Sequence, residues 1–295
     1  MVERIRFVAR AGLHLGVRSW DEEMSELPSY GRPPVTEVVL AAAFDGVPAL
    51  TIAHLGHFWF TELRAELPDI EEQPPYEPPI ESMGAPAPPV LSFQFLGGLP
   101  SPRLWAKSPD GTKLLQMQRN WIAFNWRDAP ASTEPYPRWP RVEEEFLRYF
   151  RQLCLFCDGQ GLGTPVPIQC EVTYINSIRS GTGWSDHGDL HKVLSVLAPP
   201  RGFLDRSETT QFATAFRIRD DDAIERGRLH VTAQPAFDVA DNSPALVLTL
   251  VARGAPFSPT EEGLLSFLRL GHEWVVEGFT SVTTEPMQQE WERHA

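Results

Sequence analysis

The sequence contains few cysteines, three in 295 residues, and this scarcity excludes a fold held together by disulfides. An odd number of cysteines cannot all pair within one chain, so reduced thiols in a cytoplasmic protein are expected. Cys154 and Cys157 form a C-x-x-C pair late in a predicted helix, where the negative end of the helix dipole raises a thiol pKa. We therefore expect buried structural thiols, also at Cys170, and no redox centre.

Long apolar runs are missing as well. Residues 1–33 carry charges every few positions, and they show neither an uninterrupted apolar core nor a small-residue cleavage pattern. The sequence therefore predicts no secretory signal and no membrane span. We interpret residues 1–33 as a lead-in that ends in a proline- and glycine-rich stretch.

Acidic residues outnumber basic residues. The chain has 26 Lys and Arg against 39 Asp and Glu, a formal net charge of -13 at pH 7. Binding to a phosphate backbone depends on clustered Lys and Arg, so no nucleic-acid partner is expected. The hydrophobic fraction of 42% is sufficient for the packed core of a globular protein.

Several catalytic signatures are absent. The sequence contains no G-x-S-x-G nucleophile elbow, no phosphate-binding G-x-x-x-x-G-K-[ST] loop and no dinucleotide fingerprint. The glycines at 159, 161 and 163 are explained by a helix exit before a strand. No cofactor is therefore expected.

What the sequence does contain is a repeated order of strands and helices. The first half predicts strands at 35–44, 103–107, 112–118 and 121–127, with helices at 50–67 and 141–157. The second half predicts strands at 167–178, 212–218, 228–234 and 245–253, a short helix at 190–197, a long helix that begins near Ser258 and passes through Leu264, Leu268, Val275 and Phe279, and a last short helix from Pro286.

Both halves therefore read strand, helix, three strands, helix. We predict an α+β fold of two tandem β-α-β-β-β-α units, residues 34–158 and 159–295, with antiparallel sheets that carry helices on one face. The leading strands, PPVTEVVL and PIQCEVTY, are alike over a short stretch. An internal duplication with a pseudo-two-fold relation and a chance similarity both account for this likeness.

Residues 68–89 contain eight prolines interspersed with acidic residues. Such a composition favours an extended polyproline conformation over packed structure. A surface spacer or long loop is the simpler interpretation, and a segment that docks onto a partner is the alternative.

The densest group of ionisable side chains follows the strand at 167–178. His187 and His191 have an H-x-x-x-H spacing, which places two imidazoles on one helix face if the helix begins by residue 187. Gly188 favours instead a helix that begins at Leu190, with Asp189 as its N-cap. The two imidazoles then need not converge on a metal.

Glycines at 181, 183 and 188 allow sharp backbone turns in this stretch, and an aromatic ring beside them offers a rigid anchor for a partner. We predict a binding surface without a bound metal, formed by Trp184, Asp186, His187, Asp189, His191 and, on the preceding strand, Glu171.

Several motifs occur in an order that resembles a sporadically distributed family of uncharacterised bacterial proteins. They are PPVTEVVL, CEVTYINSI, GTGW, LHVTAQPAF and LGHEWVVEGFTSVTT, and the similarity spans residues 33–293. The resemblance implies a bacterial, cytoplasmic protein, and the patchy occurrence of the family fits an accessory gene product, for example one in phage defence. It assigns no catalytic residue.

The function expected from these observations is binding. We predict a non-enzymatic protein that holds a protein partner or a small ligand in a cleft roofed by residues 181–189. The competing hypothesis is a metal-dependent hydrolase that uses Asp186, His187, Asp189 and His191.

Overall fold

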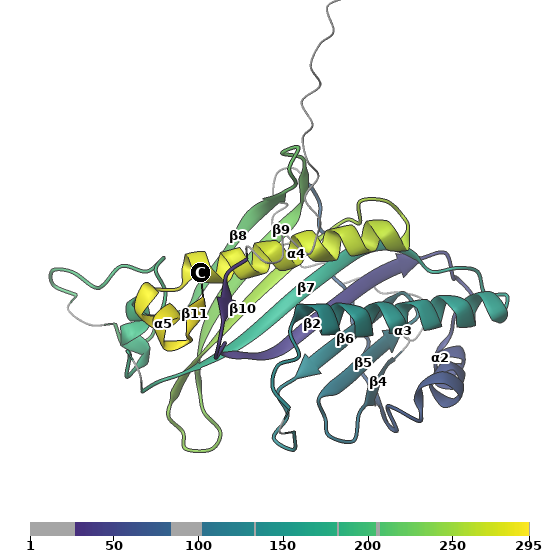
Figure 1. Cartoon of the computed structure of the whole chain (residues 1–295), viewed down its shortest axis with the longest axis horizontal. Helices are drawn as coiled ribbons and strands as arrows, with labels where there is room; N and C mark the ends of the chain where they lie inside the picture. The colour runs from purple at the N-terminus through teal and green to yellow at the C-terminus, as the bar shows by residue number, and fades with distance from the viewer. Residues whose placement is uncertain (1–26, 84–101, 133, 182, 205–206, 295) are drawn as a thin grey trace, which may run out of the picture.

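The computed structural model describes residues 27–83, 102–132, 134–181, 183–204 and 207–294. Its centre is one nine-stranded antiparallel sheet with the strand order β3-β4-β5-β6-β2-β7-β10-β9-β8 (Figure 1). The predicted α+β class is confirmed. The two sheets expected from the sequence are joined as one, because β2 and β7 pair with each other along most of their length.

The first half of the chain forms one side of this sheet. Its strands are β2 (Val35–Asp45), β3 (Asp69–Gln73), β4 (Arg103–Lys107), β5 (Lys113–Gln118) and β6 (Trp121–Arg127). From β3 to β6 each strand pairs with the next along the chain, and β6 then pairs with β2.

The second half forms the other side. Its strands are β7 (Val166–Arg179), β8 (Phe212–Arg219), β9 (Glu225–Phe237) and β10 (Pro244–Gly254). The strands β8, β9 and β10 form a meander, and β10 returns to pair with β7. A separate two-stranded ribbon joins β1 (Ser29–Tyr30) to β11 (Arg293–His294).

Helices cover one face of the sheet, which we call the helix face (Figure 1). They are α2 (Ile52–Phe58), which continues as a π-helical segment (Trp59–Leu63), α3 (Trp139–Gly159), and α4 (Glu261–Val282) followed by α5 (Glu285–Glu290). In the described part of the chain, no helix combines the length and apolarity needed to cross a membrane.

The long helix α4 packs across β7, β10 and β9 through the stripe expected from the sequence. Leu264, Leu268, Val275 and Phe279 are all buried. Gly271 permits a close approach, because a Cβ at this position would lie 3.1 Å from Cγ2 of Val172 on β7. Thr260 caps the helix by accepting a hydrogen bond from the backbone N–H of Gly263.

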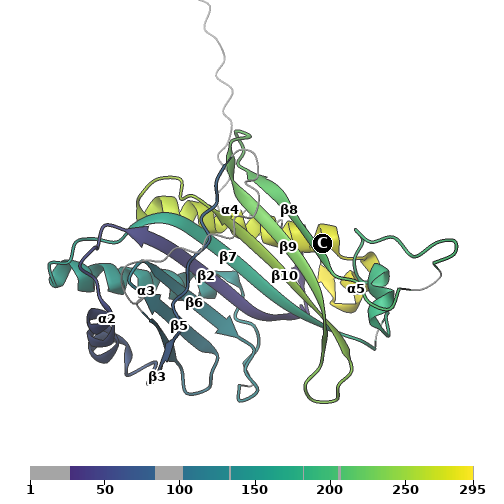
Figure 2. The same ribbon diagram turned by 180° about the vertical axis from the view of Figure 1, so that it is seen from behind.

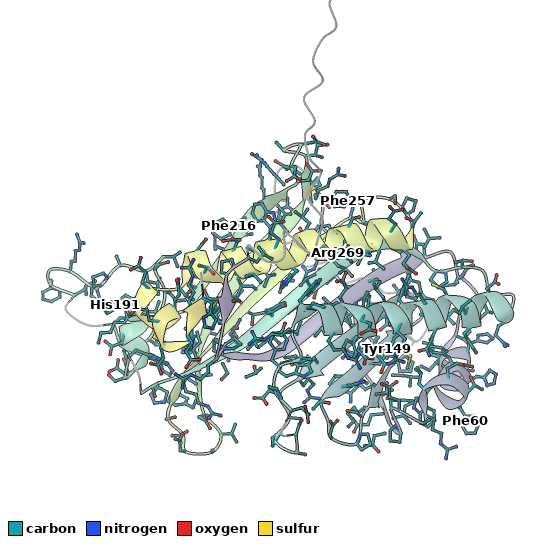
Figure 3. The ribbon with its side chains drawn as sticks, in the orientation of Figure 1. Phe60, Tyr149, His191, Phe216, Phe257 and Arg269 are labelled. Carbon is teal, nitrogen blue, oxygen red and sulfur yellow. The ribbon has the colours of Figure 1, made fainter. Side chains whose placement is uncertain are left out.

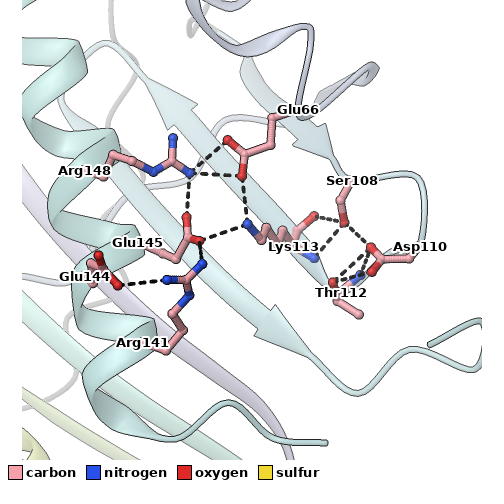
Figure 4. Close-up of polar contacts among 9 residues, drawn as sticks. All are labelled: Glu66, Ser108, Asp110, Thr112, Lys113, Arg141, Glu144, Glu145 and Arg148. Atoms are coloured by element: carbon pink, nitrogen blue, oxygen red, sulfur yellow. Dashed lines mark hydrogen bonds and ion pairs between the residues drawn. The ribbon is translucent and has the colours of Figure 1, made fainter. Parts of the chain in front are cut away.

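Helices α3 and α4 run antiparallel across the sheet. Arg151 pairs with Glu261, and Arg269 pairs with Glu143, so residue numbers rise along one helix as they fall along the other. A second group of ion pairs joins Glu145 and Arg148 of α3 to Lys113 of β5 and to Glu66 (Figure 4). These pairs fix α3 to β5 and to the chain that follows the π-helical segment.

On the opposite face of the sheet, which we call the back face, the described residues form no helix (Figure 2). Because side chains alternate along a strand, the large apolar residues of the strands point to the helix face and a different set points to the back face. Ala41, Ala43, Trp121 and Ala123 form a small cluster there, separate from the main core.

The structure corrects the interpretation of residues 68–89 as spacer alone. Residues 69–73 pair with β4 as the edge strand β3, and residues 74–83 then cross the back face as an extended segment without regular secondary structure (Figure 2). We call residues 74–83 the strap. The remainder, 84–89, lies outside the described residues.

Candidate functional site

The segment that the sequence singled out, residues 181–191, is anchored to its own chain. Trp184 is 2% exposed, and its indole N–H donates a hydrogen bond to the backbone carbonyl of Arg179 at 3.0 Å. The ring predicted to anchor a partner therefore packs inside the protein in this structure.

The helix in this segment begins earlier than predicted, so the prediction that Asp189 caps a helix starting at Leu190 is wrong. A 3-10 helix spans His187–Lys192, and its N-cap is Asp186, whose carboxylate accepts a hydrogen bond from the Gly188 N–H at 2.9 Å. Asp189 instead accepts from the Ser185 hydroxyl at 3.0 Å and pairs with Lys192 at 3.1 Å. The hydrogen bond from Lys192 holds the pKa of Asp189 below its usual value.

The two histidines of this segment have different surroundings. His187 is buried, and its Nε2 lies 2.9 Å from the carbonyl oxygen of Ala236 and 3.1 Å from that of Ala245, which attaches the 3-10 helix to β9 and β10. His191 lies at the end of the molecule beside α5 (Figure 3). Residues four apart do not line up in a helix of three residues per turn. Among the described residues, no group of three or more His, Cys, Asp or Glu side chains is arranged to hold a metal ion.

Glu171, the remaining predicted site residue, belongs to a charged group on the back face. We call this group the back-face charge cluster: Glu81 of the strap, Glu171 of β7, Arg228 and His230 of β9, and Arg253 of β10. The antiparallel pairing of β7, β10 and β9 brings these side chains to one face, since Glu171 lies opposite Arg253 and Arg253 lies opposite Arg228 in the register.

Glu81 is the centre of this cluster. Its carboxylate lies 2.6 Å from Nη1 of Arg228, 2.5 Å from Nε2 of His230 and 3.4 Å from Nη1 of Arg253. Burial raises the pKa of the Glu81 carboxyl, but the hydrogen bonds from Arg228 and His230 together with the charges of His230 and Arg253 outweigh it, so the net pKa lies below the ordinary value. Glu81 is therefore a charged group held on the sheet by cations of two strands.

Arg253 connects the two carboxylates of the cluster. Its Nε donates to Glu171 at 2.7 Å while its Nη1 faces Glu81. The hydroxyl of Thr173, two residues along β7, donates to the same Glu171 carboxylate at 2.9 Å. Glu171 thus orients the guanidinium that faces the strap, and it does not itself contact the strap carboxylate.

Two glutamine side chains bind the main chain of the strap. Gln118 of β5 accepts from the Tyr76 N–H at 2.8 Å and donates to the Tyr76 carbonyl at 2.9 Å. Gln169 of β7 accepts from the Glu81 N–H at 2.6 Å and donates to the carbonyl of Pro79. Each amide therefore contacts the strap as a neighbouring strand would, with one donor and one acceptor.

An aromatic contact fixes the other end of the strap. The rings of Tyr76 and Trp121 lie 4.9 Å apart, and the guanidinium of Arg103 lies 5.5 Å from the Tyr76 ring and 5.9 Å from the Trp121 ring. Partial burial lowers the pKa of Arg103, although the group stays charged at any physiological pH. The alanines at 41, 43 and 123 provide a flat floor next to this aromatic contact.

Most residues of this site were not found from the sequence. The polar face of β9 could be predicted from the sequence, because Arg228 and His230 alternate with the buried Leu229 and Val231. No sequence pattern pointed to Glu81, which lies 147 residues from Arg228. Its contact depends on the path of the strap across the sheet from β5 to β9, which local periodicity does not encode.

Comparison of the sequence with models of known protein families gives no match, and comparison with curated proteins gives none either.

Proposed function

We propose that this chain is a non-enzymatic binding protein whose back face holds an extended, acidic, proline-containing segment of a protein partner. The observation that carries the proposal is the position of Glu81: a carboxylate from a segment without regular structure is held by two arginines and a histidine that belong to the sheet. The strap occupies the place that the partner segment takes.

The sheet holds the strap through the kinds of contact by which proteins bind an extended peptide. Gln118 and Gln169 bind main-chain groups, which any extended peptide offers, so they supply affinity without selecting a sequence. Selection depends on the aromatic ring of Tyr76 and the carboxylate of Glu81. Prolines between these two residues favour an extended conformation before binding, which reduces the entropy lost on binding.

A tethered segment competes strongly with a free peptide. A segment of the same chain has an effective concentration on the order of millimolar, so a free peptide with the same contacts occupies the site only when the strap is weakened. We therefore expect the partner to bind best when the contacts of Tyr76 and Glu81 are removed from the strap.

The test is a titration of full-length protein with a fluorescent peptide that has the sequence of residues 74–83, PPYEPPIESM. The double variant Y76A/E81A should bind the peptide at least about tenfold more tightly than the unmodified protein. A control peptide carries glutamine in place of glutamate at the position of Glu81. It should bind the variant at least about tenfold more weakly, because charge-assisted hydrogen bonds are lost.

Circular dichroism should show that Y76A/E81A remains folded, since the helix-face core is untouched by either substitution. Equal affinity of the variant and the unmodified protein, or equal affinity for the two peptides, would contradict the proposal. Failure of the folded variant to bind the first peptide would contradict it as well.

The hydrolase alternative has less support. Asp186 caps the 3-10 helix, His187 contacts two backbone carbonyls, and Asp189 pairs with Lys192. Each of these contacts stabilises the segment and none directs a pair of side chains toward a common point.

We also propose that the chain arose by duplication of a β-α-β-β-β-α unit. Two observations support it: β2 and β7 pair at the middle of the sheet, and the order outward is β6, β5, β4 on one side and β10, β9, β8 on the other. Helices α3 and α4 follow corresponding strands, β6 and β10. An antiparallel central pair with matching order on both sides is what a pseudo-two-fold relation requires.

A cytoplasmic location is part of the proposal. The three cysteines are free, and burial raises the pKa of Cys154 to about 12 and that of Cys157 to about 11. Free, protonated thiols are the usual state of cysteine in a reducing compartment, where disulfides are rare.

A further inference from the structure

A cavity of about 190 Å³ lies on the helix face, between the beginning of α3 and the middle of α4. Tyr174 and Asn176 of β7 form its floor, Trp139 of α3 and Val275 of α4 form its walls, and Tyr30 of β1 lies on its outer side. The sheet separates this cavity from the strap. It is thus a second site, independent of the proposed back-face function.

Trp139, in the wall of the cavity, carries a buried hydrogen-bond donor without a partner among the described residues. Trp139 is 3% exposed, and its Nε1 forms no hydrogen bond with any described residue. Its ring stacks on the ring of His272, with centroids 4.1 Å apart and an angle of 6° between the planes. A buried N–H that lacks an acceptor is costly, so an acceptor that enters the cavity gains the hydrogen bond without displacing an existing one.

The polar groups beside Trp139 are neutral. A hydrogen-bonded chain runs from the Tyr136 hydroxyl to the Tyr174 hydroxyl at 2.9 Å, and from there to Nδ1 of His272 at 3.1 Å. Burial lowers the pKa of His272 to about 3 and raises that of Tyr136 to about 12. At neutral pH these three hydrogen-bonded side chains carry no charge, which disfavours a charged molecule in contact with them.

The exposed cation at the edge of the cavity is already engaged. Arg138 donates a hydrogen bond from Nη1 to the backbone carbonyl of Tyr30 at 2.9 Å, and its guanidinium lies 5.7 Å from the ring of Tyr136. It therefore connects the two sides of the opening, and most of the remaining lining is formed by aromatic and aliphatic side chains such as Phe279 and Val276.

We propose that this cavity binds a small, uncharged aromatic molecule that carries one hydrogen-bond acceptor, and that the acceptor receives its hydrogen bond from Nε1 of Trp139. Size supports a single ring, because an engineered cavity of about 150 Å³ binds benzene and this one is somewhat larger. Shape supports an aromatic ring, since Trp139, Phe279 and Tyr30 all face the cavity.

Two probe molecules of nearly equal shape separate the hydrogen bond from apolar burial. Acetophenone carries a carbonyl oxygen where cumene carries a methyl group, so only acetophenone can accept from Trp139. Full-length protein labelled with nitrogen-15 is titrated with each probe, and the indole N–H signals of its nine tryptophans are followed by NMR. The W139F variant identifies the Trp139 signal by its disappearance.

Acetophenone should shift the Trp139 signal and bind at least about tenfold more tightly than cumene, because cumene leaves the N–H without an acceptor. In W139F the preference for acetophenone should disappear. The V276F variant, which places a ring in the cavity, should lose the binding of both probes.

The proposal is overturned if neither probe binds, if cumene binds as tightly as acetophenone, or if W139F keeps the preference. Should W139F fail to fold, V276F decides: retained binding of acetophenone in folded V276F would place the probe elsewhere and overturn the proposal. The peptide titration on the back face is independent of these outcomes, so failure of one site leaves the other tested on its own.

Discussion

At the scale of single residues, the contacts of a side chain were harder to predict than its burial. Asp186 and Asp189 are both acidic and three positions apart, and only the start of the 3-10 helix decides which of them is the cap. The sequence favoured Asp189 because Gly188 disfavours an α-helix, but a 3-10 helix of six residues accommodates this glycine. Trp184 was predicted as a rigid anchor for a partner, whereas the ring is buried and its indole N–H donates a hydrogen bond to the Arg179 carbonyl.

His272 gives a prediction at this scale. Its pKa of about 3 lies below the ordinary value of 6.5 because the ring is buried. As the pH falls below 6.5 the unfolded chain takes up a proton that the folded protein does not, so the free energy of unfolding falls by up to about 1.4 kcal/mol per pH unit. Urea unfolding at pH 7 and pH 5 should show that the protein loses about 2 kcal/mol more than H272Q does. Equal losses in the two proteins would contradict the lowered pKa, because they would mean that His272 takes up a proton in the folded protein as readily as in the unfolded chain.

At the scale of elements, apolar periodicity was sufficient for most strands and helices. The strands predicted at 103–107 and 121–127 coincide with β4 and β6, and the helix predicted at 141–157 lies within α3. The edge strand β3 was missed, because Asp69–Gln73 is acidic and lies among prolines, which are features of a loop. Its pairing with β4 is a long-range effect that local propensity does not report.

Helix α4 gives the second prediction. Leu268 is fully buried between the helix and the sheet, so L268A should reduce the free energy of unfolding by about 2 to 5 kcal/mol, from lost burial and the cavity left behind. The matched control is L155A on α3, where the leucine is 73% exposed and the change should stay within about 0.5 kcal/mol. Thermal and urea unfolding measure both, and an L268A effect as small as that of L155A would show that α4 contributes little to the core.

At the scale of the whole molecule, the sheet separates two kinds of surface. The helix face is apolar and supplies the main core, with the neutral cavity beside Trp139. The back face carries charged and amide side chains, and cations gather on β9 and β10 although the protein has a net charge of -13. This local reversal of sign is the property that the proposed acidic segment would recognise.

The site was predictable only in part at this scale. Glu171 was predicted as a site residue because it is a polar side chain on the strand at 167–178, and such a side chain can point into a cleft. Its partner Arg253 follows from the antiparallel register of β7 and β10, which requires the order of strands in the sheet. The order of strands is set by pairing between segments far apart in the chain, and a single sequence carries no direct signal of it.

The central claim is that the back face binds an extended acidic segment in the place of the strap, and photo-crosslinking locates such a segment directly. The peptide of residues 74–83 is made with a photoreactive phenylalanine at the position of Tyr76, bound to full-length Y76A/E81A, irradiated and mapped by mass spectrometry. Because Tyr76 packs on Trp121 and beneath Arg103, cross-links should fall on β4 and β6, within 103–107 and 121–127. Cross-links on α3 or α4, or a scatter over the surface, would contradict the claim.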